Sequence, residues 1–247
     1  MTKTICVENH AECQIGRFAR TGRSAFTLIE LLVVIAIIGL LAGLVVGLSN
    51  HAAASSRYSR IRAELKQLET AIEAYKSKIG QYPPDNIVSR PPWTPSIVVN
   101  PVLNPLFYEL SGTIVENDRF RIPNENVGIA SATIQQFFNV EGFANASPNP
   151  KNVKGFIKDL KSTQVGKISP TDDVKVLVVP VPWPLNNPNF QSPINSTDPS
   201  VKQVNPWRYN VSNPTNNPGG FDLWAEFVDG KKVKIICNWS KDILDKP

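Results

Sequence analysis

The sequence is poor in the residues on which many enzymes and disulfide-linked domains depend. Its 247 residues include three cysteines and two histidines, which are Cys6, Cys13, Cys237, His10 and His51. Residues 52–247 therefore hold one thiol and no imidazole. This excludes an internal disulfide, a Ser-His-Asp set and a Cys-His pair within that part of the chain. We expect Cys237 to be a small apolar residue in a strand.

Charge is also scarce, and it is not arranged for a polyanionic partner. Charged residues make up 19% of the chain, and the formal net charge is +5. No run of Lys and Arg is interleaved with aromatic residues, so no nucleic-acid partner is predicted. The sequence has no Gly-rich phosphate loop, and Asp172 and Asp173 are adjacent, which on a strand would point them to opposite faces. We interpret that pair as a solvated turn and expect no enzymatic activity.

One long apolar run dominates what is present. Phe26 to Leu48 spans 23 residues, and Glu30 is its only charged residue. As a helix the run would be about 34 Å long, enough for a bilayer core of about 30 Å. Arg17, Arg20 and Arg23 precede it, so the positive-inside rule places the N-terminus in the cytoplasm and the C-terminus outside. The pattern predicts a single membrane-spanning helix.

Three glycines within this run are spaced by four residues and so share one helix face. They are Gly39, Gly43 and Gly47. Small residues at this spacing allow helices to approach closely in lipid. We expect this face to pack against neighbouring helices, although glycine is also simply common in membrane helices.

The helical pattern continues beyond the apolar run. Apolar residues recur at spacings of four and three: Ile61, Leu65, Leu68, Ile72, Tyr75 and Ile79. This stripe predicts one amphipathic helix face. Gly80 and Pro83-Pro84 then predict the end of the helix. The stripe needs a cover, either a sheet from the rest of the chain or, alternatively, a coiled-coil partner.

The C-terminal part has the clearest strand pattern. We expect strands at Phe221 to Val228 and Lys231 to Trp239, joined by an Asp229-Gly230 turn. Further elements are expected as short helices at 103–110, 129–138 and 155–161 and as strands at 173–181 and from Pro206 to Asn210. Residues 86–105, 145–154 and 182–220 are rich in Pro, Asn or Ser and are expected to be irregular.

The start of the apolar run also resembles a known signal. Residues 23–30 read Arg-Ser-Ala-Phe-Thr-Leu-Ile-Glu and are followed by Leu, Val and Ile. This resembles the N-terminal processing and methylation signal of type IV pilins and type II secretion pseudopilins. The resemblance implies cleavage between Ala25 and Phe26 by a prepilin peptidase and N-methylation of Phe26. It also implies that Glu30 meets the amino terminus of a neighbouring subunit and sets register during assembly. The residue before the cut is usually Gly, and here it is Ala25.

Two later segments resemble the G-type major pseudopilins. These are Gly80-Gln81-Tyr82-Pro83 after the long helix and the Pro206 to Gly230 region, with its Pro-Trp-x-Tyr, Gly-Phe-Asp-Leu-Trp and Asp-Gly elements. The resemblance implies an α+β pilin-like fold in which a long N-terminal helix packs against a C-terminal antiparallel sheet. That family often binds calcium after the Asp-Gly element. Asp229 matches the first acid, but Lys231 and Lys232 follow, so calcium is only a weak expectation and no other cofactor is expected.

The sequence therefore predicts four segments. They are a leader (1–25), a membrane-spanning and fibre-core half-helix (26–48), an amphipathic half-helix (49–80) and a periplasmic globular domain (81–247). The expected function is structural: a type II secretion pseudopilus subunit, anchored by a single pass in the bacterial inner membrane. Expected partners are the peptidase and methyltransferase, other pseudopilins and the inner-membrane secretion platform.

Two alternatives remain open. One is a type IV pilin or minor pilin for adhesion, motility or DNA uptake. The other is a membrane-anchored surface protein whose Asn- and Pro-rich middle binds a polysaccharide through exposed aromatic residues. Residues 182–220, although irregular, could instead be packed through Trp183, Phe190 and Trp207.

Overall fold

The structure is a computed structural model that describes residues 26–90, 97–123, 125–185 and 187–246, and for 44–51 the backbone only. The chain divides into two compact units, residues 1–51 and 52–247. The expected leader, residues 1–25, lies outside the described residues.

The predicted long helix is present. Helix α1 spans Leu28–Ile79. In the part of the chain that the structure describes, no helix combines the length and the apolar character needed to cross a membrane. The predicted membrane-spanning character of residues 26–48 is therefore not supported by the structure.

From Ala52 onward α1 carries the core of the second unit. Five of the six stripe residues are buried, and Ile79 packs against the core at partial exposure. The buried members are Ile61, Leu65, Leu68, Ile72 and Tyr75. Gly80 ends the helix as predicted. Its N–H donates to the carbonyl of Lys76 at 2.8 Å, and its φ of +93° is a conformation that glycine adopts without a steric penalty.

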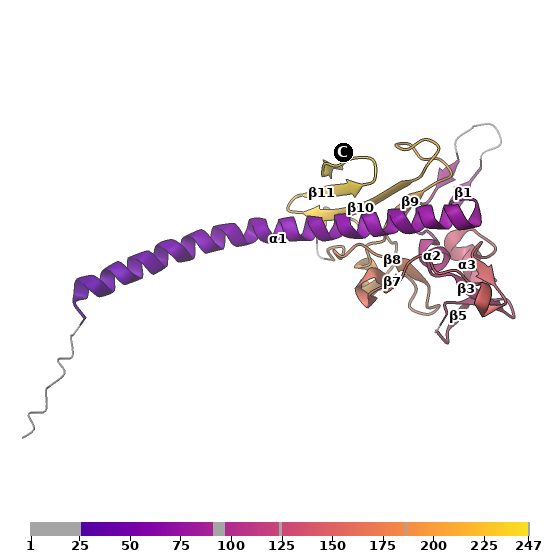
Figure 1. Cartoon of the computed structure of the whole chain (residues 1–247), viewed down its shortest axis with the longest axis horizontal. Helices are drawn as coiled ribbons and strands as arrows, with labels where there is room; N and C mark the ends of the chain where they lie inside the picture. Colours follow the sequence, from indigo (N-terminus) through magenta and orange to yellow (C-terminus); the bar gives the residue numbers. More distant parts are fainter. Residues whose placement is uncertain (1–25, 91–96, 124, 186, 247) are drawn as a thin grey trace, which may run out of the picture. The chain divides into compact units, whose positions relative to one another are not determined.

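A four-stranded antiparallel sheet covers one side of this helix, with strand order β12-β11-β10-β9 (Figure 1). Its strands are β9 (Arg208–Asn210), β10 (Asp222–Asp229), β11 (Lys232–Cys237) and β12 (Leu244–Asp245). Leu223, Ala225 and Phe227 alternate toward the core cluster that contains the α1 stripe. Asp229 pairs with Lys232, and Gly230 takes φ +62° in the turn. The predicted C-terminal hairpin is therefore confirmed, and Cys237 lies buried in β11 as expected.

A second four-stranded sheet, β5-β4-β3-β6, was not predicted. Its strands are β3 (Thr113–Glu116), β4 (Arg119–Arg121), β5 (Gly128–Ala130) and β6 (Ala146–Ser147). Helices α2 (Leu106–Ser111) and α3 (Ser131–Phe138) flank it and confirm two of the three predicted short helices. In Figure 1, β3 and β5 lie on the side of α1 away from β10 and β11. The long helix is thus covered on more than one side.

The third predicted short helix, residues 155–161, is wrong. Phe156 and Ile157 both donate their N–H to the carbonyl of Leu110, at 2.7 and 3.3 Å, and Asp159 takes a positive φ of 54°. These two N–H groups bond to another segment, so they are not available for the hydrogen bonds to the preceding turn that a helix needs. Asp172 lies exposed at a bend, as the prediction of a solvated turn implied. Asp173 differs from that prediction, because it is only partly exposed and pairs with Lys167 and, at 3.4 Å, with Lys175.

The remaining elements are short. The region expected to be a loop at 86–105 contains β1 (Ile87–Ser89) paired with β2 (Val98–Val99). The strand expected at 173–181 is limited to β8 (Lys175–Leu177), which pairs with β7 (Val165–Lys167). The largely irregular 182–220 region holds α4 (Pro199–Lys202) besides β9, and two 3-10 turns lie at Pro150–Asn152 and Ser162–Gln164.

Candidate functional site at the start of the long helix

The first turn of α1 is built around Thr27 and Glu30. The Thr27 N–H and hydroxyl both donate to Glu30 Oε2 at 2.8 Å, while the Glu30 N–H donates to Thr27 Oγ1 at 3.3 Å. These reciprocal bonds form a capping box, which satisfies helix N–H groups that have no partner within the helix. The resemblance to pilin signals predicted only an assembly role for Glu30. The Thr-x-x-Glu spacing, which marks a capping box in a sequence, could have indicated this local role as well.

Every described side chain from Phe26 to Gly43 is exposed. Phe26 is 81% exposed and Leu28 is 82% exposed, and twelve large apolar residues are exposed in this stretch. They are Phe26, Leu28, Ile29, Leu31, Leu32, Val33, Val34, Ile35, Ile37, Ile38, Leu40 and Leu41. Contiguous apolar surface of this kind marks a site of contact with protein or membrane. The segment can therefore act as a contact surface around its whole circumference.

The predicted glycine face is open. A Cβ placed on Gly39 or Gly43 would meet nothing within 4 Å. The surroundings of Gly47 lie outside what the structure describes, as does Ala25. The two described glycines leave a smooth strip on which another helix could approach closely.

Asp229, the weak calcium candidate, is engaged by protein groups. The Tyr58 hydroxyl donates to Asp229 Oδ2, and Arg57 Nη1 lies 3.7 Å from Asp229 Oδ1. This hydrogen bond raises the pKa of Tyr58. Among the described residues, no group of three or more His, Cys, Asp or Glu side chains is placed to hold a metal ion. The structure gives no support to calcium binding at Asp229.

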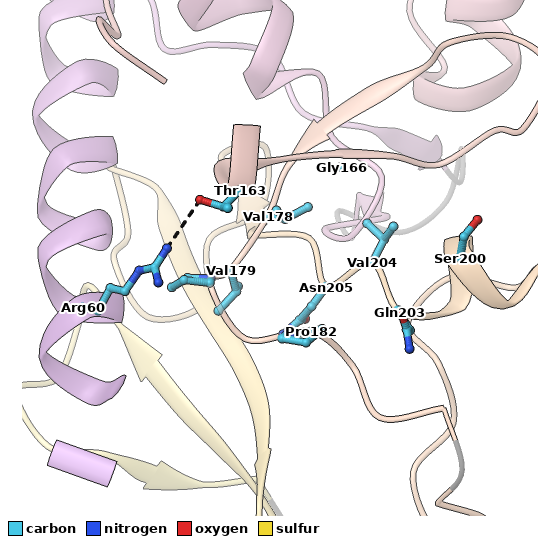
Figure 2. Close-up of a pocket in the computed structure, with 11 residues that line it drawn as sticks. Arg60, Thr163, Gly166, Val178, Val179, Pro182, Ser200, Gln203, Val204 and Asn205 are labelled. Carbon is cyan, nitrogen blue, oxygen red and sulfur yellow. Dashed lines mark hydrogen bonds between the residues drawn. The ribbon is translucent and has the colours of Figure 1, made fainter. Parts of the chain in front are cut away.

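A groove of about 370 Å³ lies beside α1 in the second unit (Figure 2). Arg60 reaches across from the helix, with its Nη2 3.5 Å from the Thr163 hydroxyl. Valine, proline and small polar side chains line the rest, including Val178, Val204 and Ser200. None of the lining residues is Asp, Glu, His or Cys, so no general acid or base accompanies the hydroxyls of Thr163 and Ser200.

Comparison with known proteins bears on the first unit. The family description "Prokaryotic N-terminal methylation motif" matches residues 20–46. The chain carries a type IV pilin-like prepilin signal. This agrees with the resemblance seen at residues 23–30 and implies processing by prepilin peptidase and assembly with other pilin-like subunits. No curated protein and no solved structure matches the chain.

Proposed function

We propose that the chain is a structural subunit of a type II secretion pseudopilus. The observation that carries this proposal is the methylation motif at residues 20–46, coupled to a helix whose described apolar side chains are all exposed from Phe26 to Leu41. A membrane would hold this segment before assembly, and neighbouring subunits would cover it afterwards. Cleavage after Ala25 and methylation of Phe26 would prepare the chain for assembly. In this role the chain needs no active site of its own.

Glu30 has two roles in this proposal. Within the monomer it caps α1 through Thr27. In the fibre its carboxylate would face the free amino group of Phe26 on a neighbouring subunit. A carboxylate and an ammonium group that are buried together offset the desolvation of both charges. The pair would then select the register of each entering subunit.

The second unit supports a pseudopilin over a type IV pilin. Its single cysteine, Cys237, is free and buried, so the unit has no disulfide-closed C-terminal loop. Gly80-Gln81-Tyr82-Pro83 ends the helix, and the β9–β12 sheet packs on the α1 stripe, as the G-type resemblance implied. The glycan-binding alternative is weakened because Trp183 and Trp207 are buried, at 5% and 1% exposure.

Deletion of the gene tests this proposal in the parent bacterium. Specific exoproteins should accumulate in the periplasm and return to the medium when the wild-type chain is supplied. A chain lacking residues 26–43 is the matched control, since it should restore nothing. Unchanged secretion, together with a loss of surface pili or of DNA uptake, would instead assign the subunit to a type IV pilus.

A further inference from the structure

The positive charge of the second unit is concentrated at one end. We define the basic end as residues 57–62 of α1 together with residues 229–246, which are the β10–β11 turn, β11 and the C-terminal segment. It carries eight Lys or Arg and three Asp. The rest of residues 26–247 carries fourteen basic and sixteen acidic residues. A charge excess of one sign therefore lies where α1 enters the second unit.

Direct contacts join the two parts of the basic end. The Tyr58 and Phe227 rings lie 5.7 Å apart, and Tyr58 and Arg57 both engage Asp229. Further along, Arg62 Nη2 donates to the carbonyl of Lys241 at 2.7 Å. The hairpin is thus held beside the first helical turns of this unit, and its cations and those of α1 form one surface.

The aspartates of the basic end neutralise only part of its positive charge. Asp245 pairs with Lys232 at 2.5 Å and also with Lys234, and Asp229 is engaged by Arg57. Within the described part of the chain, no ion pair involves Lys231, Lys241 or Arg62. These three residues, from the turn, the C-terminal segment and α1, are exposed, so their charges face the solvent.

A pocket of about 540 Å³ opens on the same end. Three lysines line it, Lys231, Lys232 and Lys246, together with the carboxylate of Asp245, and the 183–191 segment adds the buried Trp183 and the partly exposed Phe190. Lysine ammonium groups bind phosphate as point charges. Lys232 and Lys246 are also held in ion pairs with Asp245 and Glu226, so Lys231 is the ammonium group of this pocket best placed to meet the phosphate of a phospholipid headgroup.

We propose that the basic end binds the headgroups of anionic phospholipids before the subunit enters the fibre. The inference rests on the proposed membrane attachment through residues 26–48. Along the chain, Arg57 follows Leu48 by nine residues, so the basic end belongs to the part of the second unit nearest in sequence to that segment. Basic residues close to a membrane segment are attracted to anionic lipids, and the attraction acts within about 10 Å at ordinary salt. Binding would orient the second unit, and extraction into the fibre would require its release.

Lysine footprinting of the full mature chain tests the inference. The chain is placed in nanodiscs of phosphatidylcholine, or of phosphatidylcholine with phosphatidylglycerol, and acetylated briefly. In the anionic discs Lys231 and Lys232 should react several-fold more slowly, and high salt should restore their reactivity. Lys151 and Lys154, which are exposed and lie outside the basic end, provide the internal control and should react equally in both discs.

A pair of matched variants sharpens the test. Lys231→Glu with Lys232→Glu should abolish the lipid-dependent protection of backbone amides in the β10–β11 turn, measured by hydrogen exchange. Lys151→Glu with Lys154→Glu makes the same change in net charge and should leave that protection intact. Equal labelling of Lys231 and Lys232 in both kinds of disc would overturn this inference alone. Protection that depends on protein density but not on lipid would also overturn it and indicate a second copy. A chain that leaves both kinds of disc would contradict the proposed membrane attachment as well.

Discussion

Glu30→Gln should stop fibre assembly while cleavage after Ala25 continues. Glutamine at this position preserves the capping box with Thr27, because glutamine also serves at the third position of that motif. What it removes is the charge proposed to face a neighbouring amino terminus. Truncating one partner of a buried, hydrogen-bonded charge pair costs about 2–5 kcal/mol, so the amount of assembled fibre should fall by about 30-fold or more. Sheared or cross-linked fibres are counted by immunoblot.

Thr27→Ala is the control for the capping role. It removes the hydroxyl that bonds Glu30 and leaves the carboxylate in place. Loss of an N-cap costs about 0.5–2 kcal/mol of helix stability. Fibre yield should therefore fall less than with Glu30→Gln. If Thr27→Ala abolished assembly and Glu30→Gln assembled normally, Glu30 would act through the cap and not through its charge.

Arg208→Met should destabilise the second unit by about 3 kcal/mol, at the low end of the range for breaking a buried ion pair. The Arg208 Nε lies 3.4 Å from Glu226 Oε1, and both side chains are buried, at 3% and 9% exposure. Removing the guanidinium leaves a buried carboxylate. The loss is moderated because Lys246 donates to Glu226 Oε2 at 2.8 Å and the Trp224 indole donates to Oε1 at 3.1 Å. The change in the free energy of unfolding is measured by chemical denaturation of the mature protein in detergent, monitored by tryptophan fluorescence.

The destabilisation should depend on pH in a defined direction. Burial raises the pKa of Glu226, but Arg208 and Lys246 outweigh burial and hold that pKa below 4.5. In the variant the largest lowering influence is gone, so the folded-state pKa rises. The penalty should be full above the folded-state pKa of the variant, shrink as pH falls below it, and disappear below the lowered pKa of the wild-type carboxyl, where Glu226 is protonated in both proteins. Combining Arg208→Met with Glu226→Gln should recover most of the stability at neutral pH. A double variant as unstable as the single one would show that the packing of Arg208, rather than its charge, matters.

The sequence predicted best those elements whose pattern is local. The helix stripe from Ile61 to Ile79 follows the α period, Gly80 and Pro83 end it, and Asp229-Gly230 joins two strongly apolar strands. Each signal lies within one element, so no knowledge of the remaining chain is needed to interpret it.

The middle of the chain carries weaker signals. β3 and β4 are joined by Asn117 and Asp118, which both take positive φ, at 48° and 60°. This is the conformation of a two-residue type I′ hairpin turn. The Asn-Gly pair from which such a turn is usually predicted is missing here. The strands are four and three residues long and include charged side chains such as Glu116 and Arg119. An alternation of apolar and polar residues over three or four positions is too short to distinguish a strand from a loop in the sequence.

The buried polar contacts could not be predicted from the sequence either. Glu109 is fully buried and accepts hydrogen bonds from the Tyr75 hydroxyl at 2.8 Å and from the Ala144 and Asn145 N–H groups at 2.8 and 2.9 Å. Its partners come from segments 34 to 36 residues away in either direction. Such a site exists only once the tertiary fold has formed, and no local pattern marks it.

The N-terminal mass of the mature chain is the sharpest test of its place among pilin-like subunits. The protein is purified from cells with and without active prepilin peptidase and studied by mass spectrometry. With the peptidase, we expect a chain that begins at Phe26 with one methyl group on its amino nitrogen. Without the peptidase, residues 1–25 should remain attached. A chain that keeps these residues beside an active peptidase, or that is cut elsewhere, would contradict the assignment to pilin-like subunits.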